Sequence, residues 1–246
     1  MQIKTEILNT GQIDVWICRA AQWTGKRDVF FSELSPEEQK RALRFKFSEH
    51  KDRFVIFHGF MRRVLGSYLA FEASSLVFKT AEKGKPYLVS PDNEICPLNF
   101  NLSHTEDIAL LAVSSGQEVG IDIENRQRTS DWQGIARRFC TPEEQNALFL
   151  IEGMAEQREA FYDLWTRKEA YMKVLGSGLA LSPTQFNLTV APQPPALLTH
   201  YSEHFRPQKE VVFETIKLPK NLSDYCATLA VQGIFTKYKL MDPGSL

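Results

Sequence analysis

The sequence has no marked excess of charge of either sign, since its 246 residues contain 29 Lys and Arg against 30 Asp and Glu. This balance argues against nucleic acid or an anionic membrane surface as a partner. Long apolar runs are also missing: no stretch approaches the ~20 residues of a membrane span. The opening M-Q-I-K-T-E-I-L-N-T lacks the apolar core of a signal peptide. We therefore expect a cytoplasmic protein that does not bind membranes.

Cysteine is scarce and scattered. The four cysteines form no C-x-x-C pair, which argues against structural zinc and against a disulfide framework. His200 and His204 have the i,i+4 spacing of helical metal ligands, but the stretch around them is rich in proline and is not expected to be helical. With 43% hydrophobic and 24% charged residues, the chain has the composition of an ordinary globular protein.

Two helix-start signals in the sequence are nearly identical. L-S-P-E-E-Q at 34–39 and C-T-P-E-E-Q at 140–145 each combine a capping hydroxyl, a proline at the first helical position and a glutamate that closes a capping box. Further on, M-R-R-V-L-G at 61–66 is repeated as Y-M-K-V-L-G at 171–176, and both glycines are placed to end a helix. The offsets of 106 and 110 residues indicate an internal duplication.

The duplication predicts an α+β fold of two similar halves, residues 1–117 and 118–235, with 236–246 as a C-terminal tail. Strand-like sequence follows each helical region, S-S-L-V-F-K-T in the first half and T-Q-F-N-L-T-V in the second. One chain would then supply both halves, which favours a monomer. Clefts between such halves are favoured ligand sites, and the strand that opens the second half is expected near that seam.

Two carboxylates share one face of that strand. V-G-I-D-I-E at 119–124 alternates apolar and polar residues, so Asp122 and Glu124 point to the same side. A solvated strand face would account for them, and a bound cation would also relieve their mutual repulsion.

A helix is predicted for L-W-T-R-K-E-A-Y-M-K-V-L-G at 164–176. Trp165, Lys168, Glu169, Met172 and Lys173 recur at spacings of three and four and share one side of it. Taken alone, Glu169 and Lys173 could be an ordinary surface ion pair worth about 0.2–0.5 kcal/mol.

Two shorter motifs lie upstream. E-K-G-K-P-Y at 82–87 marks a turn with a cation at its tip, and F-N-L-S-H at 100–104 places Ser103 and His104 at the polar opening of a buried strand. Each is weak alone. In the order G-K-P, F-N-L-S-H, V-G-I-D-I-E and W-T-R-K-E-A-Y-M-K, the chain resembles the Sfp-like 4′-phosphopantetheinyl transferases. It fills every position of that family's pattern, (V/I)-G-(V/I)-D followed by (F/W)-(S/T/C)-x-K-E-(A/S)-x-x-K, and the resemblance covers roughly residues 12 to 235.

The resemblance implies a single-chain pseudo-dimer of two α+β subdomains related by pseudo-two-fold symmetry. It also implies transfer of the phosphopantetheine arm of coenzyme A to a serine hydroxyl of an apo acyl or peptidyl carrier protein, with release of 3′,5′-ADP. Asp122, Glu124 and Glu169 match the family's metal-binding carboxylates. Three oxygen donors suit Mg²⁺, with Mn²⁺ a plausible substitute. Glu169 would also act as general base, and Lys173 would neutralise or protonate the departing phosphate.

The coenzyme A contacts implied by the same resemblance come from several motifs. They are Arg41, Arg53, Lys85, Ser103, His104, Lys168 and Lys173. Arginine can bind phosphate bidentately, which suits the 3′-phosphate. The chain departs from the family at Glu38, where relatives carry a lysine near that phosphate. We expect Arg41, Arg44 or Lys85 to compensate.

The segment N-R-Q-R-T-S-D-W-Q-G-I-A-R-R-F at 125–139 is basic and partly apolar. Carrier proteins are typically acidic around the modified serine, so we expect Arg126, Arg137 and Arg138 to steer the carrier while apolar neighbours fix it. A solvated amphipathic segment is the alternative.

Two other function classes stay open on the sequence. A metal-dependent phosphohydrolase would use carboxylates around Mg²⁺ for attack by water. A catalytically idle module that binds coenzyme A or a carrier is disfavoured by the presence of Asp122, Glu124, Glu169 and Lys173. The sequence does not identify the carrier pathway.

Overall fold

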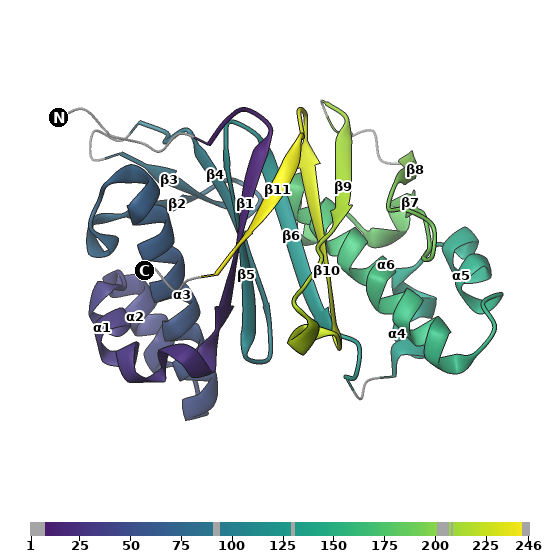
Figure 1. Cartoon of the computed structure of the whole chain (residues 1–246), viewed down its shortest axis with the longest axis horizontal. Coiled ribbons are helices and arrows are strands. Elements are labelled where there is room, and N and C mark those ends of the chain that lie inside the picture. The colour runs from purple at the N-terminus through teal and green to yellow at the C-terminus, as the bar shows by residue number, and fades with distance from the viewer. Residues whose placement is uncertain (1–7, 91–93, 129–130, 201–206, 208, 243–246) are drawn as a thin grey trace. The chain divides into compact units, whose positions relative to one another are not determined.

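A computed structural model of the chain describes residues 8–90, 94–128, 131–200, 207 and 209–242. The chain divides into two compact units, each with helices and a β-sheet (Figure 1). Unit 1 comprises Met1–Lys79, Pro86–Gly116 and Lys237–Leu246, and unit 2 comprises Thr80–Lys85 and Gln117–Thr236. The predicted α+β class is confirmed.

In unit 1 the helices follow β1, the first strand of the main sheet. Strand β1 (Gln12–Arg19) is followed by α1 (Arg27–Glu33), α2 (Pro36–Leu43) and α3 (Ser48–Leu69), then by β2 (Val77–Thr80), β3 (Pro86–Val89), β4 (Leu98–Thr105) and β5 (Ile108–Ser115). The main sheet has the order β11-β1-β5-β4, with β1 antiparallel to β5 and parallel to β11 (Lys237–Met241). Strands β2 and β3 form a separate two-stranded sheet.

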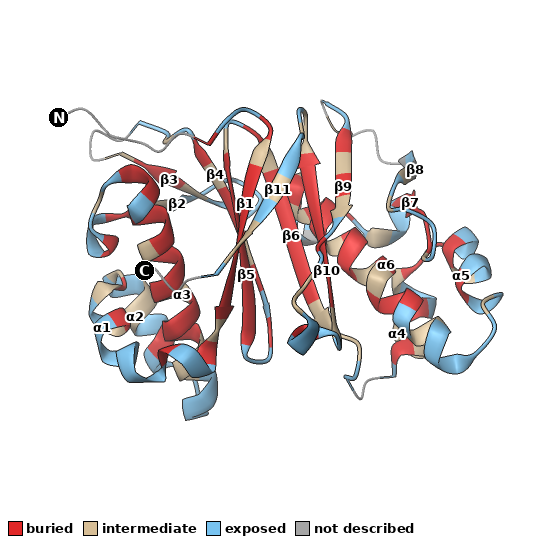
Figure 2. Cartoon of the chain, in the orientation of Figure 1, coloured by how far each residue is buried: buried red, intermediate tan, exposed pale blue. Residues whose placement is uncertain are grey.

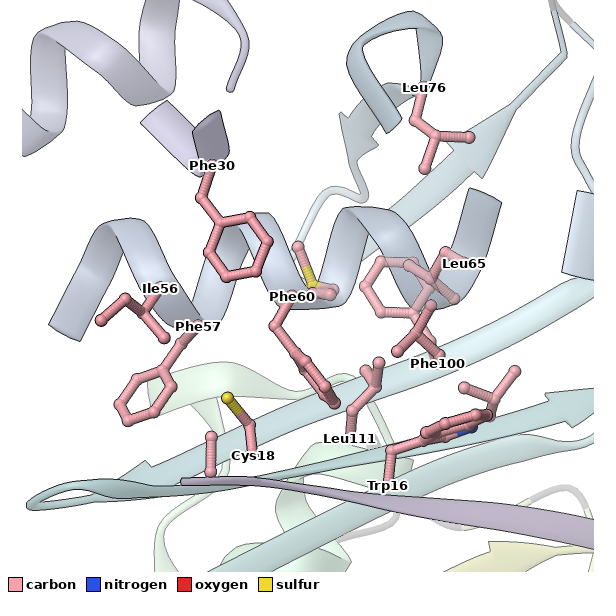
Figure 3. Packing of buried hydrophobic residues seen from close by; sticks show 14 of the residues in the cluster. Trp16, Cys18, Phe30, Ile56, Phe57, Phe60, Leu65, Leu76, Phe100 and Leu111 are labelled. Atoms are coloured by element: carbon pink, nitrogen blue, oxygen red, sulfur yellow. The ribbon is translucent and has the colours of Figure 1, made fainter. Parts of the chain in front are cut away.

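The core of unit 1 lies between α3 and this sheet (Figure 3). Phe57 and Phe60 on α3 pack toward the strand residues Cys18 and Leu111, and all four are buried. Colouring by burial shows the same division, with α3 and the central strands buried and the outer faces of α1 and α2 exposed (Figure 2). Burying these large apolar side chains supplies the main driving force for folding this unit.

Unit 2 repeats this order of elements. Strand β6 (Glu118–Asn125) is followed by α4 (Trp132–Phe139), α5 (Pro142–Phe149) and α6 (Met154–Val174), then by β7 (Phe186–Leu188), β8 (Leu197–His200), β9 (Val211–Thr215) and β10 (Tyr225–Gln232). Its main sheet has the antiparallel order β6-β10-β9, and β7 pairs with β8. Helix α6 packs along β6 and β10.

The two units match element by element. β1 and β6 begin at Gln12 and Glu118, α2 and α5 at Pro36 and Pro142, and α3 and α6 at Ser48 and Met154, a constant offset of 106 residues. Both predicted capping boxes form, on α2 and on α5. The order β1-β5-β4 in unit 1 corresponds to β6-β10-β9 in unit 2. These matches support the duplication proposed from the two sequence repeats.

Three local predictions are corrected. Gly66 does not end a helix, because α3 continues to Leu69; a Cβ at Gly66 would lie 2.5 Å from the carbonyl oxygen of Phe71, so glycine is needed there for close packing. Residues 237–241 are not part of a tail but form β11 along β1. Residues 80–85, placed in the first half by the sequence, group with unit 2. Gly176 does follow the end of α6, with a φ of +60°.

Some sequence expectations concern absent features. Within the described ranges, no helix has the length and apolar character needed to cross a membrane. All four cysteines are free thiols. His204 lies outside the described residues, so the structure does not address its spacing from His200.

Candidate active site

The candidate site in unit 2 depends on a very close contact between β6 and α6. A Cβ at Gly120 would lie 2.1 Å from the carbonyl oxygen of Ala170 and 2.5 Å from the amide nitrogen of Val174. Only glycine therefore lets the helix backbone rest on the strand here. Next to this contact, the hydroxyl of Thr166 on α6 hydrogen-bonds that of Thr228 on β10 at 3.0 Å. The helix is thus fixed against the sheet beside Asp122.

Asp122 and Lys173 form an ion pair across this contact. Asp122 is 5% exposed, and Lys173 Nζ donates to its Oδ1 at 2.6 Å and to the carbonyl oxygen of Ile121 at 3.2 Å. Lys173 is therefore directed at the strand and not into bulk water.

Glu169 lies within electrostatic reach of both strand carboxylates. Burial raises the pKa of Glu169, the negative charges of Asp122 and Glu124 raise it further, and only Lys173 opposes them. The Glu124 carboxylate in turn accepts a hydrogen bond from Arg128 Nη1 at 3.2 Å. A group of three acidic side chains from two elements is thus held next to two cations.

These carboxylates do not form a preassembled metal-binding site. Across the residues that the structure describes, no group of three or more His, Cys, Asp and Glu side chains is gathered to hold an ion. Lys173 instead pairs with Asp122, and Arg128 with Glu124. The donor chemistry nevertheless fits a hard divalent cation, because all three side chains offer carboxylate oxygens. Such an ion would compete with Lys173 and Arg128 for those oxygens.

Lys168 does not belong to this site, and its predicted contact with a coenzyme A phosphate is wrong. Its side chain is fully buried and lies 2.8 Å from Glu144 Oε1. Lys168 Nζ also donates to the carbonyl oxygens of Pro183 at 2.6 Å and Phe186 at 2.9 Å. An ammonium group has three N–H donors, and here protein oxygens take all of them.

A basic pocket in unit 1 brings together three of the predicted coenzyme A ligands. Arg41, Arg53 and His104 line a cavity of about 410 Å³. The remaining lining residues are Phe45, His50, Phe54, Phe57, His58 and Glu106. The Arg41 guanidinium lies over the Phe54 ring, and Arg53 Nε donates to Asp107 Oδ1 at 2.7 Å. Two arginines and three histidines beside aromatic rings suit an anionic ligand with a planar group.

Glu38 lies next to this pocket but does not leave an unbalanced charge there. Its carboxylate accepts hydrogen bonds from Arg62 Nε at 2.7 Å and the Ser35 N–H at 2.9 Å, and it contacts His58 Nδ1 at 3.1 Å. Burial opposes ionisation, but the bonds from His58, Ser35 and Arg62 outweigh it and lower the pKa of Glu38 to about 2. Arg62 and His58 thus balance the charge of Glu38, and compensation at the 3′-phosphate by Arg41, Arg44 or Lys85 stays a prediction.

Ser103 and Lys85 do not line the pocket. Ser103 neighbours His104 on β4, so its side chain points to the opposite face of the strand, where it is buried. Lys85 belongs to unit 2; its Nζ donates to Glu118 Oε2 at 2.6 Å and to the carbonyl oxygen of Val119 at 3.0 Å. Burial lowers the pKa of Lys85 and Glu118 opposes that shift.

The basic segment after β6 separates into paired and exposed arginines. Arg126 is engaged by Asp163 Oδ1 at 2.6 Å, whereas Arg137 and Arg138, in the last turn of α4, are exposed. Two exposed apolar side chains, Leu150 and Met154, lie beyond α5 and were not picked out from the sequence. Gln133 of α4 donates to the sulfur of Met154 at 3.7 Å, which places Met154 beside α4.

Comparison with known proteins agrees with the sequence motifs. A model of the 4′-phosphopantetheinyl transferase superfamily matches residues 118–230, and a model of the 4′-phosphopantetheinyl transferase N-terminal region matches 15–116. 4′-Phosphopantetheinyl transferase HetI from Nostoc sp. is 35% identical over 191 residues, which cover 78% of this chain and 79% of that protein. The chain belongs to the 4′-phosphopantetheinyl transferase family. A further relative in this family, 4′-phosphopantetheinyl transferase Sfp from Bacillus subtilis, is 34% identical over 163 residues, 66% of this chain and 69% of that one.

Proposed function

We propose that this phosphopantetheinyl transferase moves the phosphopantetheine arm of coenzyme A to a serine of an apo acyl or peptidyl carrier protein in a Mg²⁺-dependent reaction. The observation that carries the proposal is the Gly120 contact, which holds α6 on β6 so that Lys173 reaches Asp122. Carboxylates and a lysine from two elements are then available to one reaction centre.

The proposed chemistry assigns one proton transfer to each end of the displacement. The serine oxygen attacks the phosphorus that carries the pantetheine, the bond from that phosphorus to the bridging oxygen breaks, and 3′,5′-ADP leaves with the electron pair. Glu169 takes the serine proton as general base. Lys173 stabilises or protonates the leaving phosphate.

Asp122, Glu124 and Glu169 would hold the divalent ion. When bound, such an ion polarises the phosphoryl group and offsets its negative charge. Asp122 would then exchange Lys173 for the ion, which leaves the lysine ammonium to act on the departing phosphate.

The unit 1 pocket is the proposed site for the nucleotide end of coenzyme A. Arg41 and Arg53 supply fixed positive charge for phosphate, and His104 extends the basic surface. Charge alone would suit many anions, but the adjacent aromatic rings of Phe54 and Phe57 add a surface for a planar base.

Arg137 and Arg138 are the proposed contacts for the carrier. Because both are exposed at the end of α4, replacing them with glutamate should raise the KM for the carrier and leave the KM for coenzyme A unchanged. A KM for the carrier equal to that of the wild type would remove this surface from the proposal.

The test of the function uses coenzyme A and Mg²⁺ with and without a panel of apo-carriers, followed by intact-protein mass spectrometry and measurement of free 3′,5′-ADP. A transferase modifies the carrier at its serine, releases one 3′,5′-ADP for each modification and is idle without the carrier. Turnover of coenzyme A in the absence of a carrier would instead identify a phosphohydrolase. No reaction under either condition would favour a binding module.

A further inference from the structure

Lys168 and Glu144 form a fully satisfied buried network in unit 2. Glu144 Oε2 accepts from the Thr141 N–H at 2.9 Å, and its Oε1 accepts from the Leu188 N–H at 2.8 Å and contacts Lys168 Nζ at 2.8 Å. The lysine also holds the carbonyl oxygens of Pro183 and Phe186. One ion pair therefore ties the start of α5, the middle of α6 and the start of β7 together.

The same network occurs in unit 1 at matching positions. Glu38 caps α2 and accepts from Arg62 of α3, and Arg62 Nη1 donates to the carbonyl oxygens of Ala73 and Leu76. Glu38 and Arg62 precede Glu144 and Lys168 by 106 residues, and the two carbonyl positions precede Pro183 and Phe186 by 110. These offsets are those of the sequence repeats, so the buried pair is a shared feature of the two units.

The two units carry different residues at the three positions of the proposed metal ligands. At an offset of 106 residues, Asp122, Glu124 and Glu169 correspond to Trp16, Cys18 and Arg63 in unit 1. Unit 1 thus carries the pair without the three carboxylates, which makes it an internal reference for a purely structural role.

In unit 2 the pair lies beside a proposed metal ligand, because Lys168 immediately precedes Glu169 on α6. Each residue advances about 100° around a helix, so Lys168 lies roughly opposite Ala170, whose backbone rests on Gly120. Glu169 falls between them, toward Asp122. The helix is therefore held on its sheet side by Gly120 and Thr228 and on its opposite side by Glu144.

We infer that the Glu144–Lys168 pair is a positioning device that fixes the rotation of α6 and so aims Glu169 at the strand carboxylates. This inference rests on the proposed function, because it takes Glu169 as a metal ligand. It predicts that the pair affects metal affinity through Glu169, although neither member reaches the metal.

Two matched substitutions separate positioning from stability. Glu144→Asp keeps the charge but shortens the side chain, which pulls Lys168 and α6 out of place; Glu38→Asp makes the same change in unit 1. Mn²⁺ affinity is measured by titration of the folded proteins with electron paramagnetic resonance, and the melting temperature by circular dichroism. Both variants should melt below the wild type, but only Glu144→Asp should bind Mn²⁺ more weakly, by about tenfold, as found for residues that orient metal ligands.

A double variant provides a second test that does not depend on shortening the side chain. Glu144→Gln with Lys168→Met replaces both charges by groups of similar size, a change that buried ion pairs often tolerate. It should fold, keep the wild-type KM for coenzyme A and lose both Mn²⁺ affinity and kcat by about tenfold or more. Wild-type Mn²⁺ affinity in either folded unit 2 variant, or an equal loss in Glu38→Asp, would overturn the inference.

Failure of the proposed function gives a different result. If the wild-type protein binds no Mn²⁺, or if Asp122→Asn binds it as well as the wild type, then the proposed metal site itself is wrong. That result does not depend on the Glu144 and Lys168 variants.

Discussion

The contact between Gly120 and α6 gives the most quantitative prediction. In Gly120→Ala, the new Cβ would begin 2.1 Å from the Ala170 carbonyl oxygen, and ordinary contact starts at about 3.4 Å. The backbones of β6 and α6 must therefore separate by about 1.3 Å. A shift of that size directed away from the strand would stretch the Lys173–Asp122 hydrogen bond from 2.6 Å to about 3.9 Å, beyond hydrogen-bonding range.

Two measurable effects follow from this displacement. Overpacking of this kind costs about 1–3 kcal/mol, which for a chain of this size lowers the melting temperature by roughly 2–12 °C. A misplacement of about 1 Å in a catalytic group can cost about 100-fold in rate, so kcat for carrier modification should fall by that order. Circular dichroism gives the first quantity, and the release of 3′,5′-ADP in the presence of an apo-carrier gives the second.

Two controls test the reasoning behind this prediction. Gly25→Ala adds the same methyl group where no atom lies within 4 Å, so it should leave stability and rate unchanged. Adding Ala170→Gly to Gly120→Ala should not rescue activity, because the clash is with the backbone oxygen of residue 170. Wild-type kcat in folded Gly120→Ala would refute the claim that this contact positions the site.

Further predictions concern four individual side chains. Asp122→Asn should lower carrier modification by about 100-fold or more and abolish its dependence on Mg²⁺, measured by varying the metal concentration. Because the pKa of Glu169 is raised, the metal-free protein should lose stability as pH rises through that pKa and regain it toward pH 4.5. Thermal melts of Glu169→Gln should not show this pH dependence. The pKa of Glu38 is lowered from 4.5 to about 2, so its ionised carboxylate stabilises the fold above pH 4.5, and this stability is lost as pH falls to about 2. Glu38→Gln should therefore lower the free energy of unfolding by about 3 kcal/mol at neutral pH, measured by denaturant titration. The same variant should show a weaker loss of stability between pH 4.5 and pH 2. Arg53→Gln should raise the KM for coenzyme A by about tenfold with little change in kcat, and an unchanged KM would exclude Arg53 as a phosphate ligand.

Local sequence rules predicted the elements that carry the site. The capping boxes at Ser35 and Thr141, the strand at 119–124 and the helix at 164–176 all depend on residues close in sequence, and all occur. Strand β11 could not be predicted in this way, because K-Y-K-L-M is short, carries two lysines and forms a strand only along the edge of β1.

Two expectations about the direction of side chains conflict with geometry that the sequence already contained. Lys168 and Lys173 were placed on one side of the helix, but five residues correspond to about 500°, which leaves the two side chains about 140° apart. Ser103 and His104 are neighbours on a strand and must point to opposite faces. The partner of Lys168 was harder to foresee: Glu144 is distant in sequence, and its capping role already explained it.

The central claim is that Asp122, Glu124 and Glu169 bind the divalent ion of the transfer reaction. Its most direct test is a crystal structure of the protein with Mn²⁺ and coenzyme A, in which anomalous scattering locates the ion. We predict a peak about 2.1–2.3 Å from carboxylate oxygens of Asp122 and Glu169, with Lys173 displaced from Asp122. An ion bound elsewhere while the Lys173–Asp122 pair stays intact would contradict the account.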